Sequence, residues 1–270
     1  MVDNQSGASR KVPLKLENLQ FTGAFAARGI LNAALNLRGK VLARGLVGYG
    51  EMHGLAVAYA GHVLEVPIVV YLPSTATEDV ISSMQRWGAQ VPDRARSESE
   101  AQRLAARHAS KEGLTYIAPP INRDCLVGCA TIGLEILEFP ELDTLVAPVG
   151  FGLLAAGVAT LTKAARRDTQ VFGVDQVLRC VEPGRRPGAL GQRATPLTIE
   201  LVRRSVDDVV LVSEAELNGA ARVVWSELEV RTDPLGASAV ATLLGEHVQV
   251  GPHERVRALV GSSGGQGLFG

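Results

Sequence analysis

The sequence predicts an α/β protein in which mostly parallel sheets lie between two layers of helices. Three observations support this class. Short runs rich in β-branched residues alternate with segments of helical periodicity. Several helical segments are bounded by residues typical of helix ends. The 270 residues, 46% of them hydrophobic, supply enough apolar surface for a substantial core.

Strands and helices follow one another in pairs. The expected pairs are Val41–Val47 with Leu55–Leu64, Pro67–Leu72 with Glu78–Trp87, Gln90–Pro92 with Glu98–Lys111, and Thr144–Val149 with Leu153–Ala165. Right-handed connections between such pairs make the strands parallel. Thr75 and Ser97 each precede a glutamate by three residues, as in a capping box. Gly88 and Gly113 stand where helices commonly end.

The pattern loosens after Val174. Arg179–Thr198 is rich in Gly, Pro and Arg and is expected to be a long loop. Regular elements then resume as Ile199–Arg204, Val209–Ser213 and Glu214–Glu227. The uncharged stretch Thr144–Thr162 has the length of a membrane span, but Pro148 and three glycines favour a buried strand, a turn and a buried helix.

The composition restricts the class of ligand. The net charge is −1, from 27 basic and 28 acidic residues, so neither nucleic acid nor an anionic membrane is an expected partner. A small molecule or another protein is expected instead. The polar start of the chain lacks the apolar core of a signal peptide, and three cysteines cannot all pair within one chain. We therefore expect a reduced, cytoplasmic protein.

Four segments carry recognisable motifs. They are LKLENLQFTGAFAARGILNA at Leu14–Ala33, GYGEMHGLAVAYA at Gly48–Ala60, VAPVGFGLLAAGV at Val146–Val158 and LVGSSGGQ at Leu259–Gln266. In order and spacing they resemble the fold type II family of pyridoxal-phosphate (PLP) enzymes, the tryptophan synthase β-like superfamily, and most of all the threonine/serine dehydratases. The resemblance implies a large lobe from residues 1–40 and 127–270 and a small lobe from residues 41–126.

The resemblance also implies which residues occupy the positions that bind cofactor and substrate. The dehydratases place their PLP-binding lysine two residues before an Arg-Gly pair, where this chain has Ala26. In the loop similar to Ser-x-Gly-Asn-His, which grips the substrate carboxylate in the family, His53 matches. Tyr49, Glu51 and Met52 replace the serine, the glycine and the asparagine.

The third and fourth segments resemble the loops that hold the cofactor in the family. Gly150 and Gly152 remain of a four-glycine loop that cradles the PLP phosphate, whereas Phe151 and Leu153 add bulk at the other two positions. Ser263 matches the serine that bonds the pyridine nitrogen. These three matching residues could bind PLP without a covalent bond.

The departures conflict with PLP chemistry. Holding PLP as a Schiff base requires an amine, which alanine cannot supply. None of the five lysines lies in a segment that the resemblance places at the pocket floor, and Lys15, the nearest in sequence to Ala26, is expected to be structural. We therefore expect no cofactor, or PLP bound only non-covalently.

Four residues are candidates for other chemistry. Glu51 and His53 could direct both side chains into one cleft as an acid/base pair, although a helix dipole alone favours a glutamate at an N-terminus. Tyr49 adds a phenol. Cys129 replaces a glutamine that faces the family's cleft, and it is expected to begin a helix, where a thiolate would be stabilised; a buried, inert thiol is the alternative. No further ligands with metal-site spacing accompany Cys125 and Cys129, so no metal is expected.

Three functional interpretations remain open from the sequence. The first is a repurposed, PLP-independent acid/base enzyme that catalyses elimination, isomerisation or cyclisation of a small molecule. The second is a non-catalytic relative, either a ligand sensor or a subunit that partners an active enzyme of the family. The third is a protein that binds PLP non-covalently. A homo-oligomer or a complex with a related subunit is expected in each case.

Overall fold

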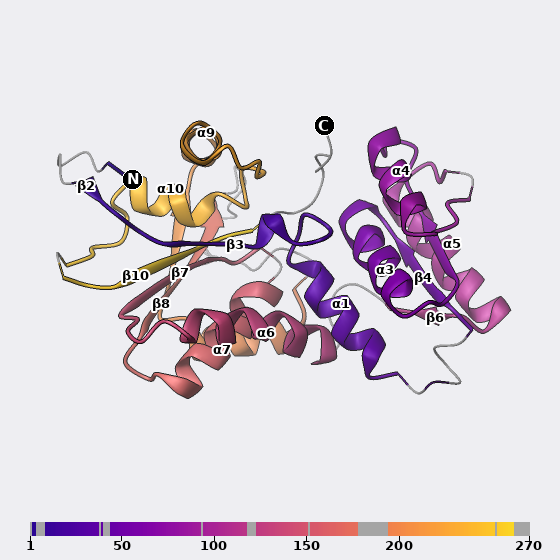
Figure 1. The fold of residues 1–270 in the computed structure, drawn as a ribbon, viewed down its shortest axis with the longest axis horizontal. Helices are drawn as coiled ribbons and strands as arrows, with labels where there is room; N and C mark the ends of the chain where they lie inside the picture. Colours follow the sequence, from indigo (N-terminus) through magenta and orange to yellow (C-terminus); the bar gives the residue numbers. More distant parts are fainter. Residues whose placement is uncertain are drawn as a thin grey trace, which may run out of the picture. The chain divides into compact units, whose positions relative to one another are not determined.

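The protein divides into two compact units. The computed structural model describes residues 2–3, 9–37, 39, 44–92, 94–117, 123–150, 152–177, 194–251 and 253–261. Unit 1 contains Met1–Asn18 and Cys129–Ser263, and unit 2 contains Leu19–Gly128. Both units have a parallel α/β core, which confirms the predicted fold class (Figure 1).

Unit 1 is built on a five-stranded sheet whose neighbouring strands all run parallel. In spatial order the strands are β3 (Leu14–Leu16), β10 (Val256–Val260), β7 (Thr144–Pro148), β8 (Gln170–Gln176) and β9 (Asp208–Val212). The central strand β7 is buried on both faces, as expected of a parallel strand between two helical layers. A short antiparallel pair, β1 (Val2–Asp3) and β2 (Ser9–Arg10), precedes the sheet.

Helices cover both faces of this sheet (Figure 1). One layer contains α9 (Glu214–Leu228) and α10 (Ser238–Leu244), whose apolar side chains pack on Val146, Val174 and Val212. The other layer contains α7 (Leu153–Ala165), α8 (Pro196–Ser205) and the second half of α6 (Arg123–Leu137). Between them, β7 and α7 account for the uncharged stretch of the sequence. No helix among the described residues combines the length and the apolarity needed to cross a membrane.

Unit 2 contains a three-stranded parallel sheet in the order β5 (Ile68–Tyr71), β4 (Leu46–Tyr49), β6 (Thr115–Tyr116). Its helices are α1 (Ala26–Leu35), α3 (Glu51–Val63), α4 (Glu78–Arg86) and α5 (Glu98–Glu112), and the 3₁₀ turn η1 (Glu17–Leu19) leads into it. All four residues of β4 are buried. This strand therefore forms the centre of the unit 2 core.

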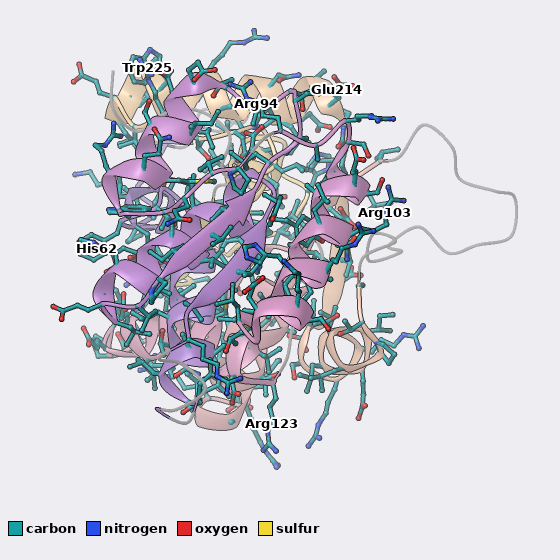
Figure 2. All side chains as sticks on the ribbon, turned by 90° about the vertical axis from the view of Figure 1, so that its right-hand side faces the viewer. His62, Arg94, Arg103, Arg123, Glu214 and Trp225 are labelled. Atoms are coloured by element: carbon teal, nitrogen blue, oxygen red, sulfur yellow. The ribbon has the colours of Figure 1, made fainter. Side chains whose placement is uncertain are left out.

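The period of two along β4 separates the two helical layers of unit 2. Val47 and Tyr49 face α5, where they pack on its alanines. Gly48 faces the other way, and a β-carbon there would lie 2.9 Å from Val57 of α3. Figure 2 shows the consequence, because His62 of α3 and Arg103 of α5 project on opposite sides of the sheet.

Several expected boundaries are wrong, each for a local reason. The capping residue of α4 is Thr77 rather than Thr75. Ser97 does cap α5, by accepting a hydrogen bond from the backbone N–H of Glu100. Helix α8 begins at Pro196, within the expected loop, because Thr195 forms a capping box and proline suits the first turn. Gln90 makes only an isolated bridge to β5 instead of starting a strand.

The two units also differ from the expected lobes. The small lobe was expected to begin at residue 41, whereas unit 2 begins at Leu19. The reason is that α1 packs against α3, with Phe21 stacked on Tyr59 at 5.1 Å between ring centroids. The expected boundary followed from the family resemblance, which did not specify the contact between α1 and α3.

Gly54 allows α3 to approach the sheet closely, and this contact positions the first turn of α3. A β-carbon at Gly54 would lie 2.5 Å from Val70 of β5 and 2.9 Å from Met84 of α4. We expect Gly54→Ala to lower the free energy of unfolding by about 1–3 kcal/mol in urea titrations, despite the better helix propensity of alanine. The control is Gly219→Ala in α9, where a β-carbon meets nothing within 4 Å. That variant is expected to gain about 0.5–1 kcal/mol, and equal losses in both variants would contradict the packing argument.

Candidate functional site

The candidate residues of unit 2 lie where β4 passes into α3. Gly50 joins the two elements with φ 72°, a conformation that favours glycine, and its N–H donates to the carbonyl of Tyr71. Helix α3 then begins at Glu51, four residues before the expected start. Glu51 and His53 therefore lie in the first turn of a helix, at the carboxyl edge of a parallel sheet, where α/β proteins commonly bind ligands.

Glu51 has an unusual environment for a helix-terminal glutamate. Its side chain is half-buried, and it makes no hydrogen bond or ion pair with any residue that the structure describes. Burial raises the pKa of Glu51, and the nearby carboxylate of Glu98 at the start of α5 raises it further. The direction matches what a general base near neutral pH needs, although the α3 dipole alone would favour the charged form.

The imidazole ring of His53 is hydrogen-bonded to the backbone. Its Nε2 lies 2.7 Å from the carbonyl oxygen of Ile117. A carbonyl can only accept, so Nε2 carries a proton and Nδ1 is the unprotonated nitrogen of the neutral ring. Burial lowers the pKa of His53 to about 4, so the ring is neutral at pH 7. No hydrogen bond joins it to Glu51 among the described residues, so the expected acid/base pair does not form as a direct contact.

The lowered pKa of His53 predicts a specific loss of stability in acid. The unfolded chain binds a proton near the ordinary pKa of 6.5, whereas the folded chain does so only near 4. Stability should therefore fall as the pH drops from about 6.5 to about 4, by up to roughly 3 kcal/mol from this residue. His53→Gln keeps an N–H donor for Ile117 and should remove this part of the pH dependence. Parallel stability curves for the two proteins in urea between pH 4 and pH 7 would contradict the assignment.

Tyr49 lies in an aromatic cluster rather than at an open surface. It is 8% exposed, and its ring centroid is 6.0 Å from that of His53 and 6.4 Å from that of Tyr116. The phenol of Tyr71 bonds to Nδ1 of His108 at 3.0 Å. Tyr49, Tyr71 and Tyr116 are each the last residue of their strand, so three tyrosines mark the carboxyl edge of this sheet.

The corresponding edge of unit 1 holds the loop between β7 and α7. Gly150 and Gly152 both have positive φ, at 50° and 85°, which explains why glycine occupies these positions. The N–H of Gly152 donates to the carbonyl of Val149 at 2.8 Å and is not available to a ligand. Two other residues of the expected cofactor site, Phe151 and Ser263, lie outside the described residues.

The described lysines do not fit the role of a Schiff-base amine. Lys15 lies 2.7 Å from Glu17 and 3.0 Å from Glu135, and these carboxylates raise its pKa against the effect of burial. Lys163 is held by Asp207, Lys111 is an exposed side chain beside Glu112, and Lys11 is exposed. A lysine that reacts with an aldehyde needs a lowered pKa, so Lys15 is a structural residue as expected.

Cys129 does not begin a helix. Helix α6 begins at Arg123, so Cys129 lies in its middle and is fully buried. A thiolate there would gain nothing from the helix N-terminus and would lose solvation. The inert alternative therefore fits this residue, and Cys125 is buried in the same helix. No metal-binding group of His, Cys, Asp or Glu occurs among the described residues.

Two acidic residues at these edges were not predicted from the sequence. Glu98 raises the pKa of Glu51 because the chain passes from one face of the sheet to the other between β5 and α5, which brings the two carboxylates near each other. The spacing of the two residues in the sequence does not reveal this proximity. Asp175 is near the end of β8, half-buried, with burial raising its pKa against a hydrogen bond from the N–H of Gln176. It directly follows Val174, the register partner of Pro148 in β7. Recognising Gln170–Gln176 as a strand would have placed Asp175 beside the glycine loop.

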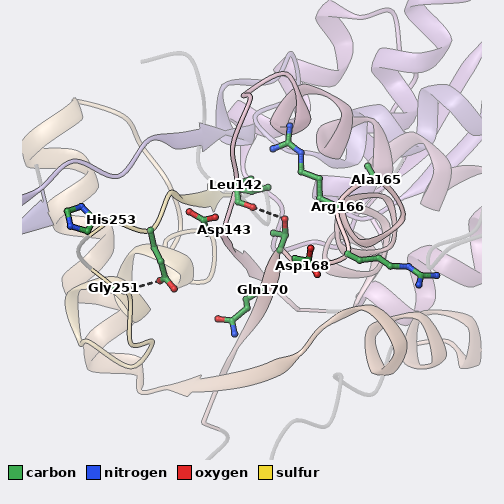
Figure 3. Close-up of a pocket in the computed structure, with 11 residues that line it drawn as sticks. Leu142, Asp143, Ala165, Arg166, Asp168, Gln170, Gly251 and His253 are labelled. Carbon is green, nitrogen blue, oxygen red and sulfur yellow. Dashed lines mark hydrogen bonds between the residues drawn. The ribbon is translucent and has the colours of Figure 1, made fainter.

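A cavity of about 860 Å³ lies at the opposite, amino edge of the unit 1 sheet (Figure 3). Acidic and basic side chains line it in similar numbers: Asp143, Asp168 and Glu254, with Arg166, Arg167 and His253. Part of the lining is bonded within the protein, since Glu254 accepts from the N–H of Gly251. None of the residues predicted from the sequence lines this cavity.

Comparison with known proteins decides the family. The profile described as "Pyridoxal-phosphate dependent enzyme" matches residues 2–261. The chain belongs to this family. Its relatives include an L-threonine ammonia-lyase of Thermotoga maritima, 31% identical over 251 residues, which are 87% of this chain and 63% of that protein. A phenylserine dehydratase of Ralstonia pickettii is 34% identical over 252 residues, 87% of this chain and 77% of that protein.

Solved structures of the PLP family have the same fold. The structure of maize serine racemase superposes with a TM-score of 0.80 at 25% identity, covering 94% of this chain and 83% of that one. The processed form of threonine deaminase isoform 2 from Solanum lycopersicum gives a TM-score of 0.82 at 26% identity, covering 95% and 75% of the two chains. The relatives thus include lyases, as the motifs implied, and a racemase, which the motifs did not predict.

Proposed function

We propose that this family member does not hold PLP as a Schiff base and instead acts on a small molecule by acid/base chemistry, as a lyase or isomerase. The observation that carries the proposal is Glu51. Its carboxyl group is half-buried, has a raised pKa and has no hydrogen-bond or ion-pair partner among the described residues. Such a group lowers the stability of the fold unless a bound ligand interacts with it.

The proposed roles follow from the contacts of each side chain. Glu51 accepts the substrate proton. It is the candidate whose pKa is raised and whose carboxylate oxygens have no hydrogen-bond or ion-pair partner among the described residues. His53 acts as a neutral ring that accepts through Nδ1 while Nε2 is held by Ile117. Tyr49 packs beside His53 and orients its ring. Cys129 takes no part.

The residues present do not fit covalently bound PLP. Ala26 occupies the position that the resemblance assigns to the lysine, and the four described lysines are either exposed or held by carboxylates. Weak, non-covalent binding through the Gly150 loop remains compatible with these residues.

Purified protein is expected to carry no PLP–lysine adduct. After incubation with PLP and reduction by borohydride, peptide mapping should find no pyridoxyl-lysine, with a dehydratase of the family as the positive control. A stoichiometric adduct on any of the five lysines would overturn the proposal. Native mass spectrometry of the unreduced protein should instead identify a retained small molecule, which supplies the candidate substrate for activity assays.

A non-catalytic role is the second candidate, and specific observations favour it. Three of the four candidate catalytic residues make contacts typical of a structural role. Tyr49 packs in an aromatic cluster, His53 is hydrogen-bonded to a backbone carbonyl, and Cys129 is buried within a helix. A ligand sensor would bind the retained molecule and release it unchanged. Turnover of that molecule, lost in a Glu51 variant, would exclude this second candidate.

A further inference from the structure

Two arginines of unit 1 converge on Phe139, which lies just past the last turn of α6. Arg166, at the end of α7, donates through Nη2 to the carbonyl oxygens of Leu137 at 3.0 Å and Phe139 at 2.7 Å. Figure 3 shows that its guanidinium points away from Asp168. The guanidinium carbon of Arg257, the second residue of β10, lies 4.5 Å from the centroid of the Phe139 ring. The cluster therefore lies at the amino edge of the unit 1 sheet.

Neither arginine has a carboxylate partner. Arg166 and Arg257 form no ion pair with any residue that the structure describes, whereas Arg255 pairs with Glu141. Glu138 is exposed and forms no ion pair with a described side chain either. The carbonyl end of a helix carries roughly half a negative elementary charge, so α6 offsets only part of the charge of the two arginines. Roughly 1.5 positive charges remain to be neutralised.

Part of each guanidinium group is buried without a hydrogen-bond partner. Nη1 of Arg166 and Nε of Arg257 are shielded from solvent and donate to no atom of the described residues. Burial lowers the pKa of Arg257, because no nearby anion offsets the loss of hydration. Buried donors and charges without partners lower the stability of the fold unless a ligand supplies acceptors and counter-charge. Both arginines are partly exposed and Phe139 is 43% exposed, so the cluster is open to a small ligand.

We propose that Arg166 and Arg257 bind a phosphate group, free or as a small monoester, beside Phe139. A phosphate group carries about −1.5 to −2 elementary charges at pH 7, which matches the excess charge of the arginines more closely than the single charge of a carboxylate. Guanidinium groups bind phosphate through charge-assisted hydrogen bonds, for which Nη1 and Nε are available. The site lies at the opposite edge of the unit 1 sheet from Gly150. Its ligand is therefore an effector rather than the substrate of the chemistry proposed above.

Calorimetric titration of the full chain with inorganic phosphate, at constant ionic strength, tests the site. Arg166→Gln and Arg257→Gln should each raise the dissociation constant at least about tenfold, because each removes a charge-assisted hydrogen bond. The matched control is Arg167→Gln, the same change of charge at the exposed neighbour of Arg166, which should alter the constant less than about twofold. Circular dichroism verifies the fold of each variant. A wild-type protein that binds no phosphate, or equal affinities in all three variants, would overturn the proposal.

Measurements on the wild-type protein locate the ligand without any substitution. The Nε–H signal of Arg257 in NMR spectra should shift as phosphate is added, and a signal that stays in place at saturation would contradict the assignment. Acetate should bind at least about tenfold more weakly than phosphate, because it carries a single charge. Equal binding of the two would assign the site to carboxylates instead. Methyl phosphate distinguishes the sources, since tighter binding than inorganic phosphate supports a monoester and weaker binding supports the free ion. None of these results depends on Glu51.

Discussion

Replacing Glu51 by glutamine is expected to lower the rate of the reaction on the retained ligand by about 10²–10⁴-fold while the fold stays intact. The substitution removes the group that accepts the proton and keeps its size. Because burial and Glu98 raise the pKa of Glu51, its charged form opposes folding at neutral pH. The neutral amide should therefore leave the melting temperature unchanged or slightly higher, so a loss of rate cannot be attributed to unfolding.

The pH profile gives the same prediction a second test. Activity requires the carboxylate, so the wild-type rate should fall as the pH drops through the raised pKa of Glu51, at a pH above its ordinary value of 4.5. Glu98→Gln is the matched control, because it removes the neighbouring charge and leaves Glu51 in place. That variant should keep its maximal rate and shift the acid limb to lower pH. An unchanged rate and melting temperature in Glu51→Gln would reduce Glu51 to a helix-terminal residue and favour the non-catalytic role.

Residue patterns predicted the layers of the fold and the first residues of α4, α5, α7 and α9, but not the starts of α3, α6 and α8. Periodicity placed α3 at Leu55–Leu64, yet the helix begins at Glu51, because its capping residue is a glycine with positive φ and no side-chain oxygen. The usual start signal of Ser, Thr, Asp or Asn is absent there. In α6 the wrong start also led to a wrong expectation about Cys129. The helix begins at Arg123, so Cys129 is buried in its middle and no helix N-terminus stabilises its thiolate.

The contacts between the candidate residues could not be predicted from the sequence. Motif resemblance identified Glu51 and His53, and Glu98 was expected at a helix start. That Glu98 lies near Glu51 follows from the strand order β5-β4-β6, which places α5 beside the end of β4. The bond from His53 to Ile117 spans 64 residues, so the neutral state of this ring could be known only from the folded chain.

Ala26→Lys is expected not to create a threonine dehydratase. The position that the resemblance assigns to the catalytic lysine is the first residue of α1, where the helix dipole disfavours an ammonium ion. An amine introduced there should have a lowered pKa and should be able to react with added PLP. Failure of the variant would therefore arise from the rest of the site and not from the amine.

Two further departures, and one hydrogen bond within the glycine loop, should keep deamination at least about 10³-fold below the rate of a working dehydratase. Met52 offers no amide where the family has asparagine, Leu153 adds bulk at the start of α7, and the N–H of Gly152 is already bonded to Val149. Release of 2-oxobutanoate from threonine is the measurement, and peptide mapping after borohydride reduction establishes whether the new amine carries PLP. Adding Met52→Asn and Glu51→Gly to the variant tests the substrate loop, where the carboxylate of Glu51 would repel the carboxylate of threonine. Production of 2-oxobutanoate at a dehydratase-like rate by Ala26→Lys alone would mean that the lysine was the one essential loss.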